Sequence, residues 1–195
     1  MEALQTIPRA EEFFAIIEDR LKPKTLHHVL GVTELILRVA PGLGISLEDA
    51  AAVGLLHDLC KPLKRNEMLA AAEAYGITIN ETQREKPALL HGPVAAEEAR
   101  RELNVQSEGV YEAIYYHTTG KPGLGIVGQA LYFADFSEPN RTYAGSAEAR
   151  ALLAAEGFPK ALLYAADAKL EVVRTKSAID PMTQAFNDWL HEQYD

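Results

Sequence analysis

The stretch over residues 52–61, AVGLLHDLCK, constrains the fold of this chain more than any other. Its first residues are apolar on every side of a helix, and such a helix belongs in a protein core. The stretch nevertheless ends in His57, Asp58 and Lys61, and a charged carboxylate taken out of water needs an ionic partner or a metal. We therefore predict a buried helix that ends at Pro62 and brings a histidine and an aspartate to a polar centre.

A His-Asp pair by itself is also explained by a helix-end histidine beside a capping aspartate. This pair is accompanied, however, by His28, His91, His117 and Asp135, each in a segment that is otherwise apolar or that bounds a helix. Imidazole and carboxylate groups suit iron, manganese, zinc, nickel or cobalt. The only cysteine, Cys60, cannot supply the thiolate set of a structural zinc site. The six residues are therefore candidate ligands of a metal cluster.

The periodicity of a predicted helix over residues 25–40 separates two adjacent histidines. His28 shares a helix face with three apolar residues, Val32, Leu35 and Val39. His27 lies on a polar face, which we assign to solvent, with Gly31, Glu34 and Arg38. An inward histidine is often a satisfied core residue, but the other candidate ligands favour a metal-binding role for His28.

The remaining candidate ligands also lie where a helix can direct them. His91 stands just before Pro93 at a predicted helix start, and His117 shares a helix face with Val110 and Ile114. Asp135 ends the apolar face of a predicted helix over residues 125–136. A carboxylate in this position needs a cation.

Candidate substrate contacts follow these ligands in the sequence. Thr118, Thr119 and Gly120 begin a loop directly after His117, from which they can touch a substrate, although an ordinary connector explains the loop equally well. The planar donors of Arg141 can contact phosphate, or the side chain can pair with Glu138. We give both interpretations of Arg141 equal weight.

Other segments are predicted to act as scaffold. Helices are expected over residues 11–21 and 66–75, with an irregular loop over 77–87 before His91. From Ser146 onward the pattern predicts three further scaffold helices, over 147–155, 159–175 and 181–194, the last with Asp180 as its N-cap.

Composition limits the partners and the compartment. The 195 residues suffice for one domain, 1–195, with a sizeable core. A net charge of −9 gives no support for binding to nucleic acid or to an anionic membrane. One cysteine, no signal peptide and no apolar run of roughly 20 residues predict a cytoplasmic protein. The oligomeric state, a homodimer included, stays open.

The ordered set of candidate ligands resembles that of the HD-domain metal-dependent phosphohydrolases. The local sequences HVLGV (28–32), GLLHDLCK (54–61), LHGP (90–93), YHTTG (116–120) and ADFSEP (134–139) are similar to those of one bacterial subfamily. That subfamily comprises the HD-type symmetrical diadenosine tetraphosphate (Ap4A) hydrolases. The resemblance covers roughly residues 20–175, and the ordered set is more specific than any single piece.

This resemblance implies an all-α, single-domain helical bundle that holds two metal ions, usually iron. The implied ligands are His28, His57, Asp58, His91, His117 and Asp135. Asp58 would bridge both metals, and the reaction would cleave Ap4A, a small-molecule nucleotide, into two ADP. Two metals activate water and neutralise phosphoryl oxygens. Lys61, together with Arg141, would add charge stabilisation.

Fold and ligands do not choose the substrate by themselves. A nucleotidase acting on monophosphates or deoxynucleotides would keep the same site, as would a phosphodiesterase acting on a cyclic nucleotide. A non-enzymatic helical module that binds a nucleotide or a partner is a third interpretation. Six metal ligands argue against that module, since binding alone does not need them.

Overall fold

The computed structural model describes residues 2–142, 145–175 and 179–194. These residues form eleven α-helices, three short 3-10 helices and no strand, so the predicted all-α class is confirmed. The 3-10 helices are Glu2–Thr6, Ala40–Leu43 and Pro87–Leu90. The α-helices are α1 Ala10–Arg20, α2 Pro23–Val39, α3 Leu47–Leu56, α4 Arg65–Ala74, α5 Glu81–Glu85, α6 His91–Arg101, α7 Glu108–Tyr116, α8 Ile126–Ser137, α9 Ser146–Glu156, α10 Phe158–Arg174 and α11 Pro181–Tyr194.

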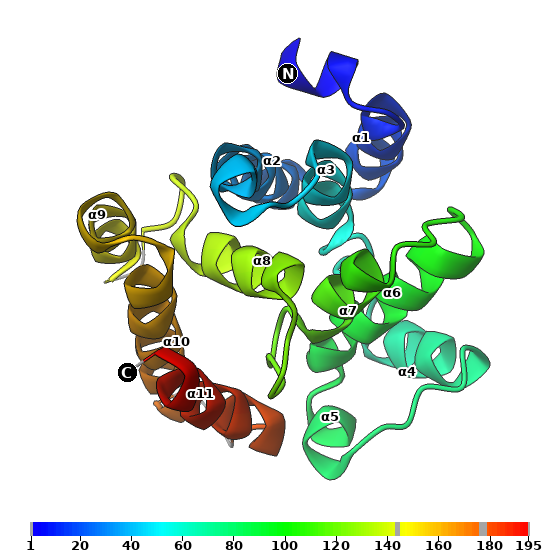
Figure 1. Cartoon of the computed structure of the whole chain (residues 1–195). Coiled ribbons are helices and arrows are strands. Elements are labelled where there is room, and N and C mark those ends of the chain that lie inside the picture. Colours follow the sequence, from blue (N-terminus) through cyan, green and yellow to red (C-terminus); the bar gives the residue numbers. More distant parts are fainter. Residues whose placement is uncertain (1, 143–144, 176–178, 195) are drawn as a thin grey trace.

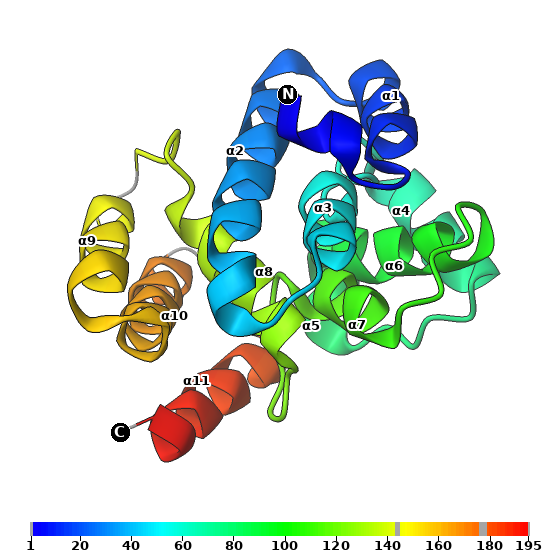
Figure 2. The same ribbon diagram turned by 45° about the horizontal axis from the view of Figure 1, so that its top comes forward.

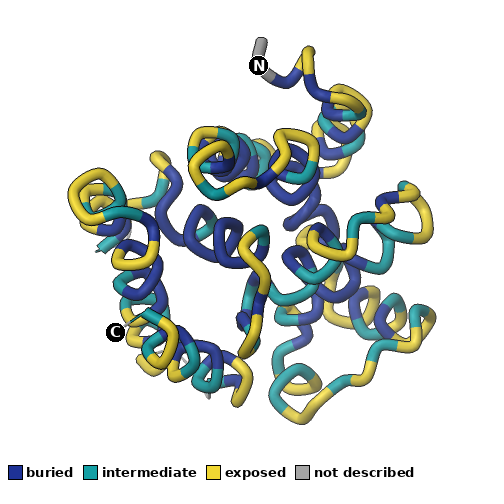
Figure 3. Tube along the Cα trace, in the orientation of Figure 1, coloured by how far each residue is buried: buried dark blue, intermediate teal, exposed yellow. Residues whose placement is uncertain are grey.

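Helix α8 lies at the centre of the bundle, with α2 and α3 on one side and α6 and α7 on another (Figure 1). Helices α9, α10 and α11 form a separate flank that packs against α8 through α10 and α9 (Figure 2). The burial pattern agrees with this arrangement, because nearly all of α8 is buried while α9 is largely exposed (Figure 3). The core therefore surrounds the helix that ends just after Asp135.

Helix α3 ends earlier than the sequence predicts. It begins after Ser46, whose hydroxyl accepts a hydrogen bond from the backbone N–H of Asp49 as the N-cap. The prediction that the helix continues to Lys61 is wrong, since α3 ends at Leu56. The chain then turns more tightly, with Lys61 N–H donating to the carbonyl of Asp58 at 3.0 Å. His57 and Asp58 lie at this change of backbone geometry, and both are buried.

Two further boundaries differ from the predictions. The segment over 77–87 is not an irregular loop, because Asn80 and Gln83 form a capping box that starts the short helix α5. Helix α6 begins at His91 itself, so Pro93 is its third residue, where the missing N–H still costs no helical hydrogen bond.

Helix α11 packs against the loop that follows His117. The ring of Phe186 lies so close to Gly120 that a side chain at position 120 would overlap it, and φ at Gly120 is +69°. Glycine at this position is therefore required by both the backbone and the packing. Among the described residues, no helix is long and apolar enough to cross a bilayer.

Candidate metal centre

Two groups of possible metal-ligating atoms lie next to each other inside the bundle. His28, His57 and Asp58 form one group, and Asp58, His91 and His117 form the other. Within each group the nitrogen and oxygen atoms all lie within 4.8 Å of one another. Asp58 belongs to both groups, and its side chain is fully buried. The site therefore has the donors for two metals that share one carboxylate.

Backbone carbonyls orient three of the four rings. The Nδ1 atom of His57 lies 2.8 Å from the carbonyl oxygen of Gly54. His91 and His117 make the same contact with the carbonyls three residues before them, at 2.5 Å and 2.8 Å. Nδ1 must carry the proton to donate in this way, so each ring presents the lone pair of Nε2 to the centre. Such an orienting contact is the usual support of a metal-binding histidine.

The atoms that face the centre lack the partners that buried polar groups need. The Nε2 atoms of His91 and His117 are 2.9 Å apart, so two lone pairs point toward each other. His57 Nε2 and Asp58 Oδ1 are buried and make no hydrogen bond of acceptable geometry. Unpaired groups of this kind are costly in a protein interior. A divalent cation among nitrogen and oxygen donors would satisfy all of them, so the residues present fit a metal site.

Burial keeps His57 and His117 neutral, and the neighbouring groups keep Asp58 charged. Burial lowers the pKa of His57 to about 4, and it holds the pKa of His117 well below its ordinary value. Burial would raise the pKa of Asp58, but His57, His91 and Lys61 outweigh it and hold that pKa well below its usual range. At neutral pH His57 and His117 therefore offer imidazole lone pairs and Asp58 offers a carboxylate, which are the forms that bind metal.

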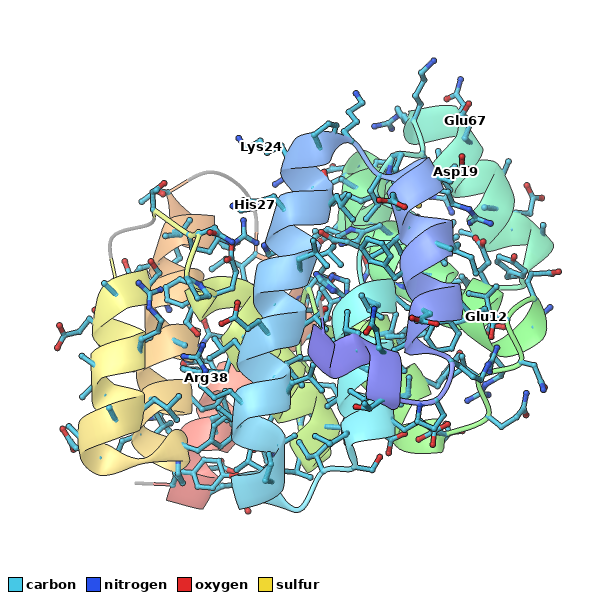
Figure 4. All side chains as sticks on the ribbon, turned by 90° about the horizontal axis from the view of Figure 1, so that it is seen from above. Glu12, Asp19, Lys24, His27, Arg38 and Glu67 are labelled. Carbon is cyan, nitrogen blue, oxygen red and sulfur yellow. The ribbon has the colours of Figure 1, made fainter. Side chains whose placement is uncertain are left out.

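The two histidines of α2 lie as the helix phase predicts. His28 is 8% exposed, whereas His27 is exposed and labelled on the outer surface of α2 in Figure 4. His28 Nδ1 lies 3.2 Å from Oε1 of Glu138, and His28 Nε2 faces Asp58 at 3.7 Å. A carboxylate behind a ring in this way fixes the orientation of the ring as a ligand.

Asp135 joins the cluster from the C-terminal end of α8. Its Oδ1 atom lies 3.1 Å from His28 Nε2 and 2.8 Å from Nη2 of Arg141. Arg141 is 4.0 Å from Glu138, so its shorter ion pair is with Asp135, a partner that neither sequence interpretation named. Burial would raise the pKa of Asp135, but His28, Lys169 and Arg141 hold it well below its usual range.

Sequence reasoning missed two residues at the centre, Glu138 and Lys169. The ammonium of Lys169 lies 3.6 Å from Asp135 Oδ2 and donates to the carbonyl of His117 at 3.1 Å. Helix α10 is thus more than scaffold, which corrects the prediction for the chain after Ser146. Helical spacing could have indicated that Lys169 points inward. Lys169 lies seven residues, or about two turns, after the buried Leu162 and so falls on the apolar face of α10. Glu138 stands beside a proline and has no such periodic signal.

The residues predicted to contact substrate differ in their exposure to solvent. Lys61 Nζ is 2.7 Å from Asp58 Oδ2, and 43% of its side chain is exposed, so it can reach both the centre and solvent. Thr119 is buried and its hydroxyl donates to the carbonyl of Gly120. Thr118 and Thr119 line a cavity of only about 60 Å³ that also includes Tyr116. The role of this loop in substrate binding stays a prediction.

The first prediction compares the adjacent histidines. Replacement of His28 with alanine is expected to lower the metal content per chain, because it removes a buried nitrogen that faces Asp58. The matched variant His27→Ala is expected to keep the wild-type metal content, since His27 points outward. Elemental analysis after purification without oxygen or chelator measures both. Equal metal content in the two variants would contradict the assignment.

The helical bundle and its buried histidine–aspartate cluster define the class of this protein. The sequence profile of the HD domain matches residues 25–172, and the chain belongs to this family. It is 33% identical to the symmetrical bis(5'-nucleosyl)-tetraphosphatase of Bacillus subtilis (strain 168), over 73% of this chain and 76% of that protein. The enzyme of the same name from Staphylococcus aureus (strain NCTC 8325 / PS 47) is 28% identical over 76% of each chain.

A crystal structure agrees with this family relationship. It is described as a predicted HD superfamily hydrolase involved in NAD metabolism from Clostridium acetobutylicum. It superposes with a TM-score of 0.88 at 27% identity and covers 96% of this chain and 99% of that chain.

Proposed function

We propose that this protein is a symmetrical bis(5'-nucleosyl)-tetraphosphatase that hydrolyses Ap4A to two ADP with two divalent metals. The names of its relatives in Bacillus subtilis and Staphylococcus aureus support the substrate. The observation that carries the reaction type is Asp58, which belongs to both groups of donors. A shared carboxylate is suited to two metals about 3.5–4 Å apart, the arrangement that serves in-line displacement at phosphorus.

Metals bound here would activate water and neutralise charge on the phosphoryl oxygens. The proposed ligands are His28, His57, Asp58, His91, His117 and Asp135. Iron is the proposed metal, and manganese, zinc, nickel or cobalt are accepted by the same donor types.

The remaining residues of the centre have separate roles in this proposal. Lys61 is the most accessible cation, and its ammonium can move from Asp58 to an oxygen of the phosphoryl group under attack. Arg141 holds Asp135 in place. Water forms the new P–O bond at the second phosphorus and gives up its proton to solvent, and the bond to the central bridging oxygen breaks. The leaving group is ADP, a stable phosphate anion, so departure needs no proton from the protein.

Product analysis tests this proposal. Incubation of the metal-loaded protein with Ap4A is expected to give ADP as the only nucleotide product, resolved by ion-exchange chromatography. AMP together with ATP would contradict symmetrical cleavage. The panel should include AMP and a cyclic nucleotide, because a nucleotidase and a phosphodiesterase would use the same centre. It should also include NAD, since the similar structure from Clostridium acetobutylicum is described as acting in NAD metabolism.

The absence of Ap4A turnover with both iron and manganese would favour a monophosphate nucleotidase. If none of the panel is hydrolysed while the metals are bound, a non-enzymatic nucleotide-binding module is the better interpretation.

A further inference from the structure

A cleft opens beside His28, on the outer side of the metal centre. It has a volume of about 220 Å³ and lies between the first turns of α2 and the segment after α8. Its lining residues are Lys24, His27, His28, Glu138, Asn140, Arg141 and Thr142. Because His28 forms one wall and Arg141 Nη2 lies 3.1 Å from His28 Nε2, the cleft adjoins the candidate metal centre directly.

The cleft offers hydrogen-bond donors and positive charge. Its one carboxylate, Glu138, is 1% exposed and already engaged, with Oε1 facing His28 Nδ1 and Oε2 accepting from the backbone N–H of Asn140 at 2.6 Å. Lys24 is exposed at the cleft, and among the described residues no carboxylate forms an ion pair with it. In a protein with a net charge of −9, a local cation beside the centre favours a polyanion there.

A wider groove continues from this cleft along α2. The groove has a volume of about 590 Å³ and shares His27 and Asn140 with the cleft. Its α2 wall includes the polar face that the sequence assigns to solvent: His27, Gly31, Glu34 and Arg38. Figure 4 shows Lys24, His27 and Arg38 along one side of this helix.

Gly31 helps to form this passage. The residue is buried, because Glu138 and Asn140 pack over it, and a Cβ at this position would lie 2.8 Å from Asn140 Nδ2. The polar face of α2 is therefore only partly exposed to solvent. At Gly31, the absence of a side chain allows the segment after α8 to lie close to α2.

The two volumes differ in what they can hold. Pockets for small ligands have volumes of roughly 300–1,000 Å³, a range that includes the groove and exceeds the cleft. The cleft suits a short anionic chain, and the groove leaves room for the group attached to that chain. A substrate with four phosphates between two nucleosides needs such an outlet, because only the phosphates nearest the metals can be held by them.

We propose that this cleft is a phosphate-binding subsite for the half of the dinucleotide that extends beyond the metal centre, with Lys24 as its phosphate-contacting cation. The inference rests on the proposed function. Lys24 contacts the phosphates of the half in the cleft rather than the phosphorus under attack. It therefore acts on substrate affinity and leaves the chemical step unchanged.

Direct binding tests this inference without relying on turnover. The probe is an Ap4A analogue in which a methylene group replaces the central bridging oxygen, titrated calorimetrically into manganese-loaded protein. Lys24→Ala is expected to weaken binding about tenfold, the loss typical of one hydrogen bond to a charged group. The matched control is Lys22→Ala, which removes an exposed lysine two residues earlier that does not line the cleft, and a change below twofold is expected.

Kinetics and a rescue variant complete the test. With Ap4A, Lys24→Ala is expected to raise KM about tenfold with kcat unchanged within twofold, and Lys24→Arg to restore most of the affinity. Equal affinity of Lys24→Ala and wild type, equal losses in both alanine variants, or no binding of the analogue to wild type would overturn the inference. If wild type binds the analogue but does not hydrolyse Ap4A, the proposed function fails while the lysine comparison still decides the subsite.

Discussion

Replacement of Asp58 with alanine is expected to abolish Ap4A hydrolysis and to release both metals. Asp58 is the one residue common to both donor groups, and its two oxygens face His91 at 3.1 Å and His28 at 3.7 Å. In the proposed two-metal site, its removal would take a ligand from each metal at once. We expect turnover to fall by at least about 10³-fold, beyond the effect of losing one stabilising contact. Metal content should fall from close to two ions per chain to well below one.

Two comparisons separate this effect from damage to the fold. Asp58→Asn keeps the shape of the side chain and removes only the charge, so it should lose activity and metal as the alanine variant does. Asp19→Ala removes an exposed carboxylate in the last turn of α1, labelled in Figure 4, and should retain both. An Asp58→Ala protein with two metals and wild-type turnover would remove this residue from the mechanism.

Removal of the metals is expected to lower the melting temperature of the protein by about 10 °C. A ligand present at about 1,000 times its Kd stabilises the native state by about 4 kcal/mol. In a chain of this size, 1 kcal/mol shifts the melting temperature by roughly 2–4 °C. After the chelator has removed the metals, His57 Nε2 and Asp58 Oδ1 are buried without hydrogen-bond partners, which lowers the stability of the native state further. Thermal unfolding followed by circular dichroism, with and without chelator, measures the shift.

The Asp58→Ala variant is the control for this measurement. If the stabilisation arises at the proposed centre, a chelator should leave the melting temperature of that variant almost unchanged. A similar shift in wild type and variant would place the stabilising metal elsewhere. An unchanged melting temperature in wild type would show that the fold does not depend on the metals.

Helical periodicity could predict which residues face inward, because the repeat of 3.6 residues leaves little choice of phase. The repeat points His28 and His117 inward, and both are buried. The end of α3 could not be predicted by the same rule. The chain changes to i→i−3 hydrogen bonds after Leu56, and the donors that surround His57 and Asp58 come from other helices, so the apolar pattern of α3 does not indicate where it ends.

The residues that contact the candidate ligands from outside are harder to predict than the ligands themselves. Glu138 approaches His28 across 110 residues of sequence, and no local pattern indicates that contact. The sequence offers Arg141 either a phosphate group or Glu138 as a partner. In the structure its shorter ion pair is with Asp135 instead. Lys169 was detectable in principle, as a lysine on an apolar helix face. The cytoplasmic location stays a prediction, and the oligomeric state stays open.

The support that Lys169 gives to Asp135 and His117 has a consequence for how the protein matures. Contacts between residues far apart in sequence form late, since the entropy of closing the intervening chain must be overcome first. A chain emerging from the ribosome presents His28 and His57 long before α10 is made. In the proposed metal site, these early histidines would still lack Asp135 and its supporting lysine. Secure binding of metal would therefore require the synthesis of α10.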